Sequence, residues 1–81
     1  MKKINYKEIM ALIDNKQFYA AEDILNEIIK KHPMEAKAHY FLGVVYSYRN
    51  ETERSIKQYK KVISLDPNYA DAYFSLGMIW N

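Results

Sequence analysis

The side chains in this sequence that could carry chemistry are two histidines and several clustered charges. His32 and His39 are separated by Pro33. Because proline ends a helix at the preceding residue, the two histidines cannot share one helix face as two metal ligands would. We expect His32 at a helix end and His39 in a packed position. Cysteine is absent, which excludes thiolate catalysis and cysteine metal sites. We therefore predict no metal and no cofactor.

The carboxylates Glu22, Asp23 and Glu27 lie close to lysines in the sequence. Solvated helix faces with ion pairs four residues apart explain this pattern without an acid–base role. No glycine-rich phosphate loop and no nucleophile motif accompanies them. We therefore expect that the chain is not an enzyme.

A short basic stripe could instead contact phosphates; it consists of Arg54, Lys57, Lys60 and Lys61. Acidic residues are interleaved with it, and the formal net charge of the whole chain is only +2. A solvated outer helix face explains this arrangement better than a nucleic-acid site does. We predict no nucleic-acid partner.

These side chains must be positioned by helices, because apolar residues recur with the helical period along most of the chain. The pattern predicts five helices, at about residues 4–13, 17–31, 35–48, 52–65 and from 69 onward. The third is apolar around more than one face, so we expect contacts on two sides. Asn50 suits a left-handed turn position, and with Glu53 it has the spacing of a capping box.

The helices repeat with a fixed offset. Pairs of identical residues stand 34 positions apart, among them Pro33 and Pro67, Leu42 and Leu76, and Gly43 and Gly77. A period of this length is typical of stacked helical repeats. No apolar run approaches the ~20 residues that cross a bilayer, and no signal peptide is evident. We expect a soluble, cytoplasmic protein without a membrane partner.

The middle unit resembles the tetratricopeptide repeat. Landmarks of that family stand at Ala36, Leu42, Gly43, Tyr46, Tyr59 and Asp66–Pro67, and again at Tyr73, Leu76, Gly77 and Trp80. The resemblance implies an all-α fold, a right-handed superhelix of five helices in antiparallel hairpins. It implies a single domain over residues 1–81, with a first repeat at about 2–35, a second at 36–69 and a partial third at 70–81.

The first unit departs from the pattern. Counting from Pro33, Glu8 and Ile9 stand where the other units have Leu-Gly. Sliding the first helix by one residue instead places Tyr6, Ile9 and Ile13 on large apolar positions of the family. We favour the slide, which predicts a first turn one residue shorter than the second.

The resemblance also implies that the first helix of each hairpin lines a concave surface. We call the candidate binding residues the predicted groove; they are Tyr6, Met10, Lys37, Tyr40, Phe41, Val44, Tyr48, Phe74 and Met78. Family members that bind chaperone tails use lysine, asparagine and arginine at positions held here by Tyr6, Met10, Phe41, Asp71 and Ser75. We therefore expect an apolar or amphipathic protein segment as partner. The alternative is that several of these residues only pack between repeats.

The last helix carries Leu76, Ile79 and Trp80, with no following helix in the sequence to cover them. Exposed apolar side chains of this size favour association. A competing hypothesis is therefore a self-assembly element that forms a homo-oligomer by stacking or exchange of its C-terminal helix.

Overall fold

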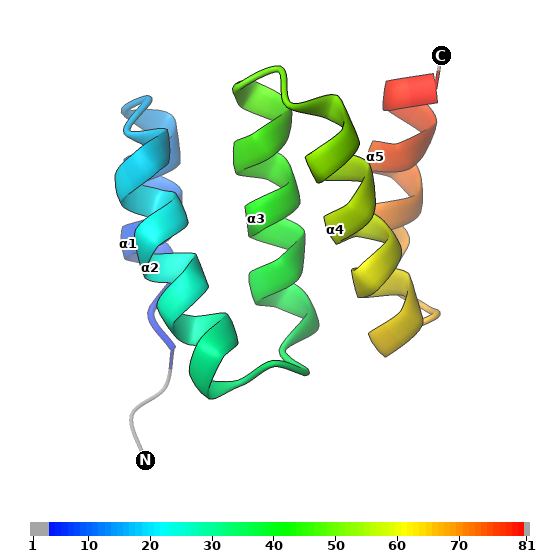
Figure 1. Cartoon of the computed structure of the whole chain (residues 1–81), viewed down its shortest axis with the longest axis horizontal. Coiled ribbons are helices and arrows are strands. Elements are labelled where there is room, and N and C mark those ends of the chain that lie inside the picture. Colours follow the sequence, from blue (N-terminus) through cyan, green and yellow to red (C-terminus); the bar gives the residue numbers. More distant parts are fainter. Residues whose placement is uncertain (1–3, 81) are drawn as a thin grey trace.

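The computed structural model describes the backbone of residues 4–80 and the side chains of residues 4–79. It contains five helices: α1 (Tyr6–Asp14), α2 (Phe18–Lys31), α3 (Ala36–Tyr48), α4 (Thr52–Leu65) and α5 (Ala70–Trp80). The described residues form no strand. Figure 1 shows α1 and α2 at one end of the long axis, α4 and α5 at the other, and α3 between them. The all-α prediction and the five predicted helices are confirmed.

Both interhelical prolines follow a helix end at the same place. α2 ends one residue before His32 and α4 one residue before Asp66, and each of these residues precedes a proline. A residue before proline is pushed out of the helical region, and both caps have extended ψ values, 72° and 93°. The 34-residue offset therefore has the same physical cause at both ends.

The turns inside the two complete hairpins also superpose at this offset. Lys16 and Asn50, 34 residues apart, both have φ of 61°. The Gln17 N–H donates to the Leu12 carbonyl at 2.8 Å, and the Glu51 N–H donates to the Tyr46 carbonyl at 2.9 Å. The predicted slide of the first helix is therefore wrong, and so is the shorter first turn. One left-handed residue closes each hairpin; Asn tolerates that conformation, and Lys adopts it here with the same hydrogen bond.

This register places Ile9 where the second hairpin has Gly43. Ile9 is fully buried, as is Leu25, which stands 34 residues before Tyr59. In the second hairpin a Cβ added to Gly43 would lie 2.7 Å from Cε1 of Tyr59. The first hairpin thus combines a larger residue on its first helix with a smaller one on its second.

The predicted capping box at Asn50 and Glu53 is wrong. α4 begins at Thr52, its N-cap residue is Glu51, and no side chain makes the cap hydrogen bond. Asn50 lies one residue too early and uses its left-handed backbone for the turn instead. Its predicted turn role is confirmed.

The core lies on both sides of α3. Ala38, Leu42 and Val45 join Ile9, Ala21 and Leu25 in one buried cluster, while Gly43 meets Tyr59 of α4. The predicted contact of this helix on two sides is confirmed. Such burial is what makes an otherwise short helix stable.

A buried charge cluster links the two hairpins. Arg49, at the end of α3, lies 2.6 Å from both the Glu22 and the Glu51 carboxylates, and its guanidinium stands 4.1 Å from the Tyr19 ring centroid. The Glu22 side chain is only 16% exposed. The expectation that Glu22 lies on a solvated face is therefore wrong, because α3 covers it and supplies a cation.

Candidate functional site

Four residues of the predicted groove form one contiguous cluster. The Tyr6 and Phe41 rings stack with centroids 5.5 Å apart, and Tyr40 meets Phe41 edge-on at 5.6 Å. The ammonium group of Lys37 lies 4.8 Å from the centroid of Tyr6. A cation over an aromatic face at this distance is attractive. Residues of α1 and α3 that are distant in sequence therefore form one surface.

Two tyrosines outside the predicted groove extend this cluster. Tyr40 lies 5.8 Å from Tyr59 and 5.4 Å from Tyr69 between ring centroids. Tyr59 comes from α4 and Tyr69 from the residue just before α5. Periodicity indicated Tyr59 only as a packing landmark, and no landmark of the first hairpin corresponds to Tyr69. Contact with Tyr40 is what joins them to the groove.

The remaining groove residues are more exposed. Tyr48, Phe74 and Met78 are 61%, 70% and 65% exposed, and Met10 is 49% exposed. The Tyr48 ring stacks on Phe18 at 5.4 Å, which fixes its orientation, and Val44 is half-buried. Large exposed apolar side chains of this kind favour contact with another molecule when they gather on one surface.

Two of these exposed residues line a common hollow. It has a volume of about 360 Å³ and lies between the end of α3, the start of α4 and α5; its walls are Ser47, Asn50, Thr52, Tyr59, Phe74, Ser75, Met78 and Ile79. The hollow combines apolar anchors with hydroxyl and amide groups, as ligand-binding surfaces do. Tyr6 and Lys37 are not part of it. The predicted groove is therefore divided into an aromatic cluster and this hollow.

The aromatic cluster also changes the acidity of its phenols. Burial, with a contribution from the nearby Glu35 carboxylate, raises the pKa of Tyr6 to about 12. Burial likewise raises the pKa values of Tyr59 and Tyr69. The Tyr6 hydroxyl is buried without a hydrogen-bond partner among the described residues. These phenols stay neutral at physiological pH, so charge on this surface comes from lysine and carboxylate groups.

The last helix differs from its sequence prediction at one position. Leu76 is only 5% exposed, so the expectation that it forms an exposed apolar end is wrong; α4 packs against α5 and covers that side. Ile79 is half-buried, and the side chain of Trp80 lies outside the described residues. Gly77, by contrast, has no described atom within 4 Å of an added Cβ. The uncovered side of α5 is therefore the Gly77 side.

His39 has a structural role. Its Nε2 donates to the Pro33 carbonyl at 2.9 Å, and its Nδ1 lies 2.9 Å from the side-chain amide of Gln58. Its predicted packed position is confirmed by 7% exposure. Within the described part of the chain, no three histidine or acidic side chains gather as metal ligands would. No helix in that part is long and apolar enough to span a membrane.

The basic stripe on α4 lies where the sequence predicts it. Arg54, Lys57, Lys60 and Lys61 are all exposed. Its prediction as an outer helix face is therefore confirmed.

Comparisons with known proteins agree with this geometry. A family model described as "TPR repeat" matches residues 45–79, which span the second half of α3, all of α4 and most of α5. A solved structure, the crystal structure of MamA, superposes with a TM-score of 0.84 at 33% sequence identity, covering 89% of this chain and 42% of that one.

A curated relative is the UDP-N-acetylglucosamine–peptide N-acetylglucosaminyltransferase of Giardia intestinalis. It is 26% identical over 77 residues, which are 95% of this chain and 5% of the relative. The chain thus spans less than half of MamA and a small part of the transferase. Residues 45–79 are a tetratricopeptide repeat, and the chain as a whole has the helical-repeat fold of a tetratricopeptide-repeat protein.

Proposed function

We propose that this chain is a non-catalytic scaffold that binds an amphipathic or apolar protein segment in the predicted groove. Tetratricopeptide repeats generally mediate contacts between proteins. The observation that carries the finer proposal is the exposure of Tyr48, Phe74 and Met78 on α3 and α5. These are the side chains that an apolar partner would cover.

Three features support an amphipathic partner over a charged one. Burial of a large apolar side chain stabilises a complex by roughly 1.5–3 kcal/mol, and aromatic side chains lose little rotamer entropy on binding. Ser47 and Ser75 line the same hollow as Phe74 and Met78, so polar groups surround the apolar anchors. Lys37 already lies over Tyr6, which leaves this surface without an obvious cluster of free cations for a carboxylate.

The test is an array of amphipathic helical peptides that differ in their apolar residues. For the peptides that bind, we expect Met78→Ala and Phe74→Ala each to weaken the affinity about tenfold. Met34→Ala is the matched control, because Met34 is 79% exposed but lies in the loop between α2 and α3. Equal affinities for Met78→Ala and Met34→Ala would show that the hollow is not the binding site.

A second candidate function is self-assembly through α5. The observation that favours it is the open space beside Gly77, since the equivalent Gly43 is covered by Tyr59 of α4. A helix of another copy placed there would bury Ile79 further. Fusion of a polar capping helix after Asn81 separates the two hypotheses. Groove binding predicts a monomer that still binds peptide, whereas self-assembly through α5 predicts loss of both the oligomer and the function.

A cytoplasmic location and the lack of a nucleic-acid partner remain predictions from the sequence.

A further inference from the structure

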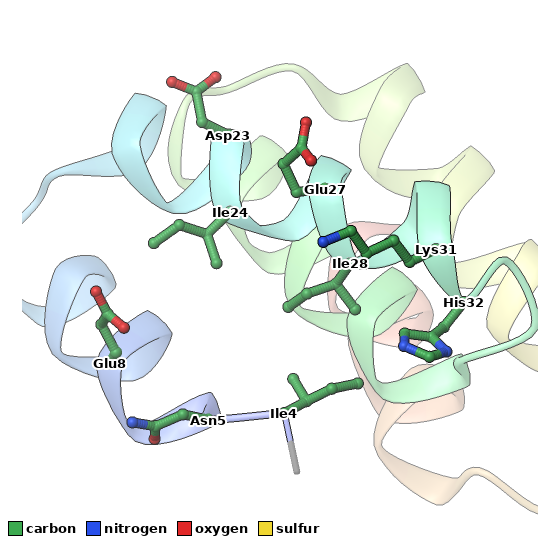
Figure 2. A pocket seen from close by; sticks show the side chains of 9 residues that line it. All are labelled: Ile4, Asn5, Glu8, Asp23, Ile24, Glu27, Ile28, Lys31 and His32. Carbon is green, nitrogen blue, oxygen red and sulfur yellow. The ribbon is translucent and has the colours of Figure 1, made fainter. Parts of the chain in front are cut away.

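The first hairpin carries an apolar hollow with an acidic rim, on a different surface from the predicted groove. The hollow has a volume of about 450 Å³ and lies between α1 and α2. Ile4, Ile24 and Ile28 converge in it, while Asp23 and Glu27 point outward from α2 (Figure 2). Glu8 adds a third carboxylate from α1. This surface suits a partner with long cationic side chains, whose methylene stems cover apolar surface while the charge stays at the rim.

The second hairpin presents the opposite charge at equivalent positions. Lys57 and Lys61 stand 34 residues after Asp23 and Glu27. With Lys60 they line a hollow of about 440 Å³ beside His39 and Gln58. Because the two hairpins are in register throughout their turns, these side chains have equivalent placements on α2 and α4.

All four of these side chains are available to a partner. Asp23, Glu27, Lys57 and Lys61 are exposed. Among the described residues, the ion pairs within 4.0 Å involve only Arg49, Arg54, Glu22 and Glu51. The two reversed pairs of charges are thus not satisfied within the chain.

We infer that this surface binds a second copy of the chain, with α2 of each copy lying over α4 of the other. α2 and α4 run in the same direction and lie on the same side of the molecule (Figure 1). A two-fold axis parallel to both helices places Asp23 opposite Lys57 and Glu27 opposite Lys61, and symmetry repeats both pairs. The lysine stems then cover Ile24 and Ile28. We call this surface the α2–α4 face.

The other exposed positions are compatible with this pairing. Tyr19 meets Glu53, Asn26 meets Lys60, and Lys30 meets Ser64, so no equivalent pair brings like charges together. A two-fold axis perpendicular to the helices would instead place α2 on α2, with carboxylates facing carboxylates. Charge complementarity therefore selects one orientation as well as the partner.

Charge exchange between two variants tests the inference in sedimentation velocity at about 20 mM salt, where screening is weak. Asp23→Lys/Glu27→Lys makes the α2–α4 face basic throughout, and Lys57→Glu/Lys61→Glu makes it acidic throughout. We expect each variant alone to self-associate at least tenfold more weakly than the wild type. An equimolar mixture should restore association as a heterodimer, because both opposite-charge contacts form again. Lys7→Glu/Lys16→Glu is the control, with the same net charge as the acidic variant but substitutions away from this face.

Three results would overturn the inference. They are a wild type that stays monomeric at low salt, self-association of either variant at the wild-type strength, or a mixture that does not associate. Circular dichroism verifies folding; if the reversals disturb α2, Asp23→Asn/Glu27→Gln gives the same loss without new cations. None of these results alters peptide affinity at the predicted groove, so the proposed function is tested separately.

Discussion

Tyr59 packs directly over Gly43: a Cβ added to Gly43 would lie 2.7 Å from Cε1 and 2.9 Å from Cδ1 of the ring. Real Cβ atoms do not approach another carbon this closely, so either α3 or the ring would have to move. Tyr59 is only 2% exposed and contacts Tyr40 as well. Close contact between α3 and α4 is therefore coupled to the aromatic cluster of the predicted groove.

Substitution of the two glycines should have opposite effects on stability. Gly43→Ala is expected to destabilise by about 1–3 kcal/mol, since overpacking exceeds the gain in helix propensity. Gly77→Ala meets no described atom and should stabilise by up to about 1 kcal/mol. Urea unfolding of both variants measures the difference. Similar free energies of unfolding for the two would contradict the packing role of Gly43.

Exchange of volume between the hairpins should be possible. The first hairpin has Ile9 and Leu25 where the second has Gly43 and Tyr59. We expect Gly43→Ile to destabilise strongly and the double variant Gly43→Ile/Tyr59→Leu to recover part of that loss. A coupling free energy of about 1–3 kcal/mol in a double-mutant cycle is the expected result. Simple additivity would show that the two positions do not compete for the same space.

Tyr6 should make the fold sensitive to alkaline pH. Its folded pKa is about 12 against an ordinary value of 10.0, so the unfolded chain loses the phenolic proton first. The stability that the neutral phenol contributes is present below about pH 10 and is lost as pH rises toward 12. Tyr6→Phe removes this part of the loss and also removes a buried hydroxyl without a partner, for a gain of about 1 kcal/mol at neutral pH.

Urea unfolding at about pH 9 and about pH 11 measures this difference. Tyr73→Phe is a useful comparison, because the Tyr73 hydroxyl donates to the Pro67 carbonyl at 3.0 Å and should lose stability at neutral pH. A wild type and a Tyr6→Phe variant with equal alkaline losses would exclude the role given to Tyr6.

Arg49 should contribute far more to stability than Arg54. Arg49→Ala leaves Glu22 half-buried without its cation, so we expect a loss of about 1–3 kcal/mol. Arg54 pairs with Glu51 at 3.4 Å with its side chain 65% exposed, and Arg54→Ala should change stability by less than about 1 kcal/mol. Thermal unfolding of the two variants checks the order. Equal midpoints would mean that the Arg49 cluster is not an anchor between the hairpins.

The sequence predicts the helices well because their signals are local. The apolar period, the two prolines and the turn at Asn50 each act within a few residues, and the helix ends follow them closely. Glu22 shows the limit: its partner Arg49 is 27 residues away, and only the packing of α3 against α2 brings the two together. Likewise, no local pattern shows that α4 buries Leu76.

The register of the first helix fails for a related reason. Ile9 in the place of Gly43 is acceptable only because Leu25 replaces Tyr59, and a single pattern of apolar positions does not reveal compensation between two helices. The positive φ of Lys16 is equally hidden, since lysine carries no preference for that conformation. In the predicted groove, Tyr69 was missed because its contact with Tyr40 crosses from α3 to the loop before α5.

Chemical-shift mapping tests the central claim, peptide binding in the predicted groove, most directly. ¹⁵N-labelled protein is titrated with the tightest peptide from the amphipathic array. We expect the largest amide shifts at Val44, Tyr48, Phe74 and Met78, with little change along the exposed side of α2 and α4. Shifts concentrated at Asp23, Glu27, Lys57 and Lys61 instead would contradict groove binding.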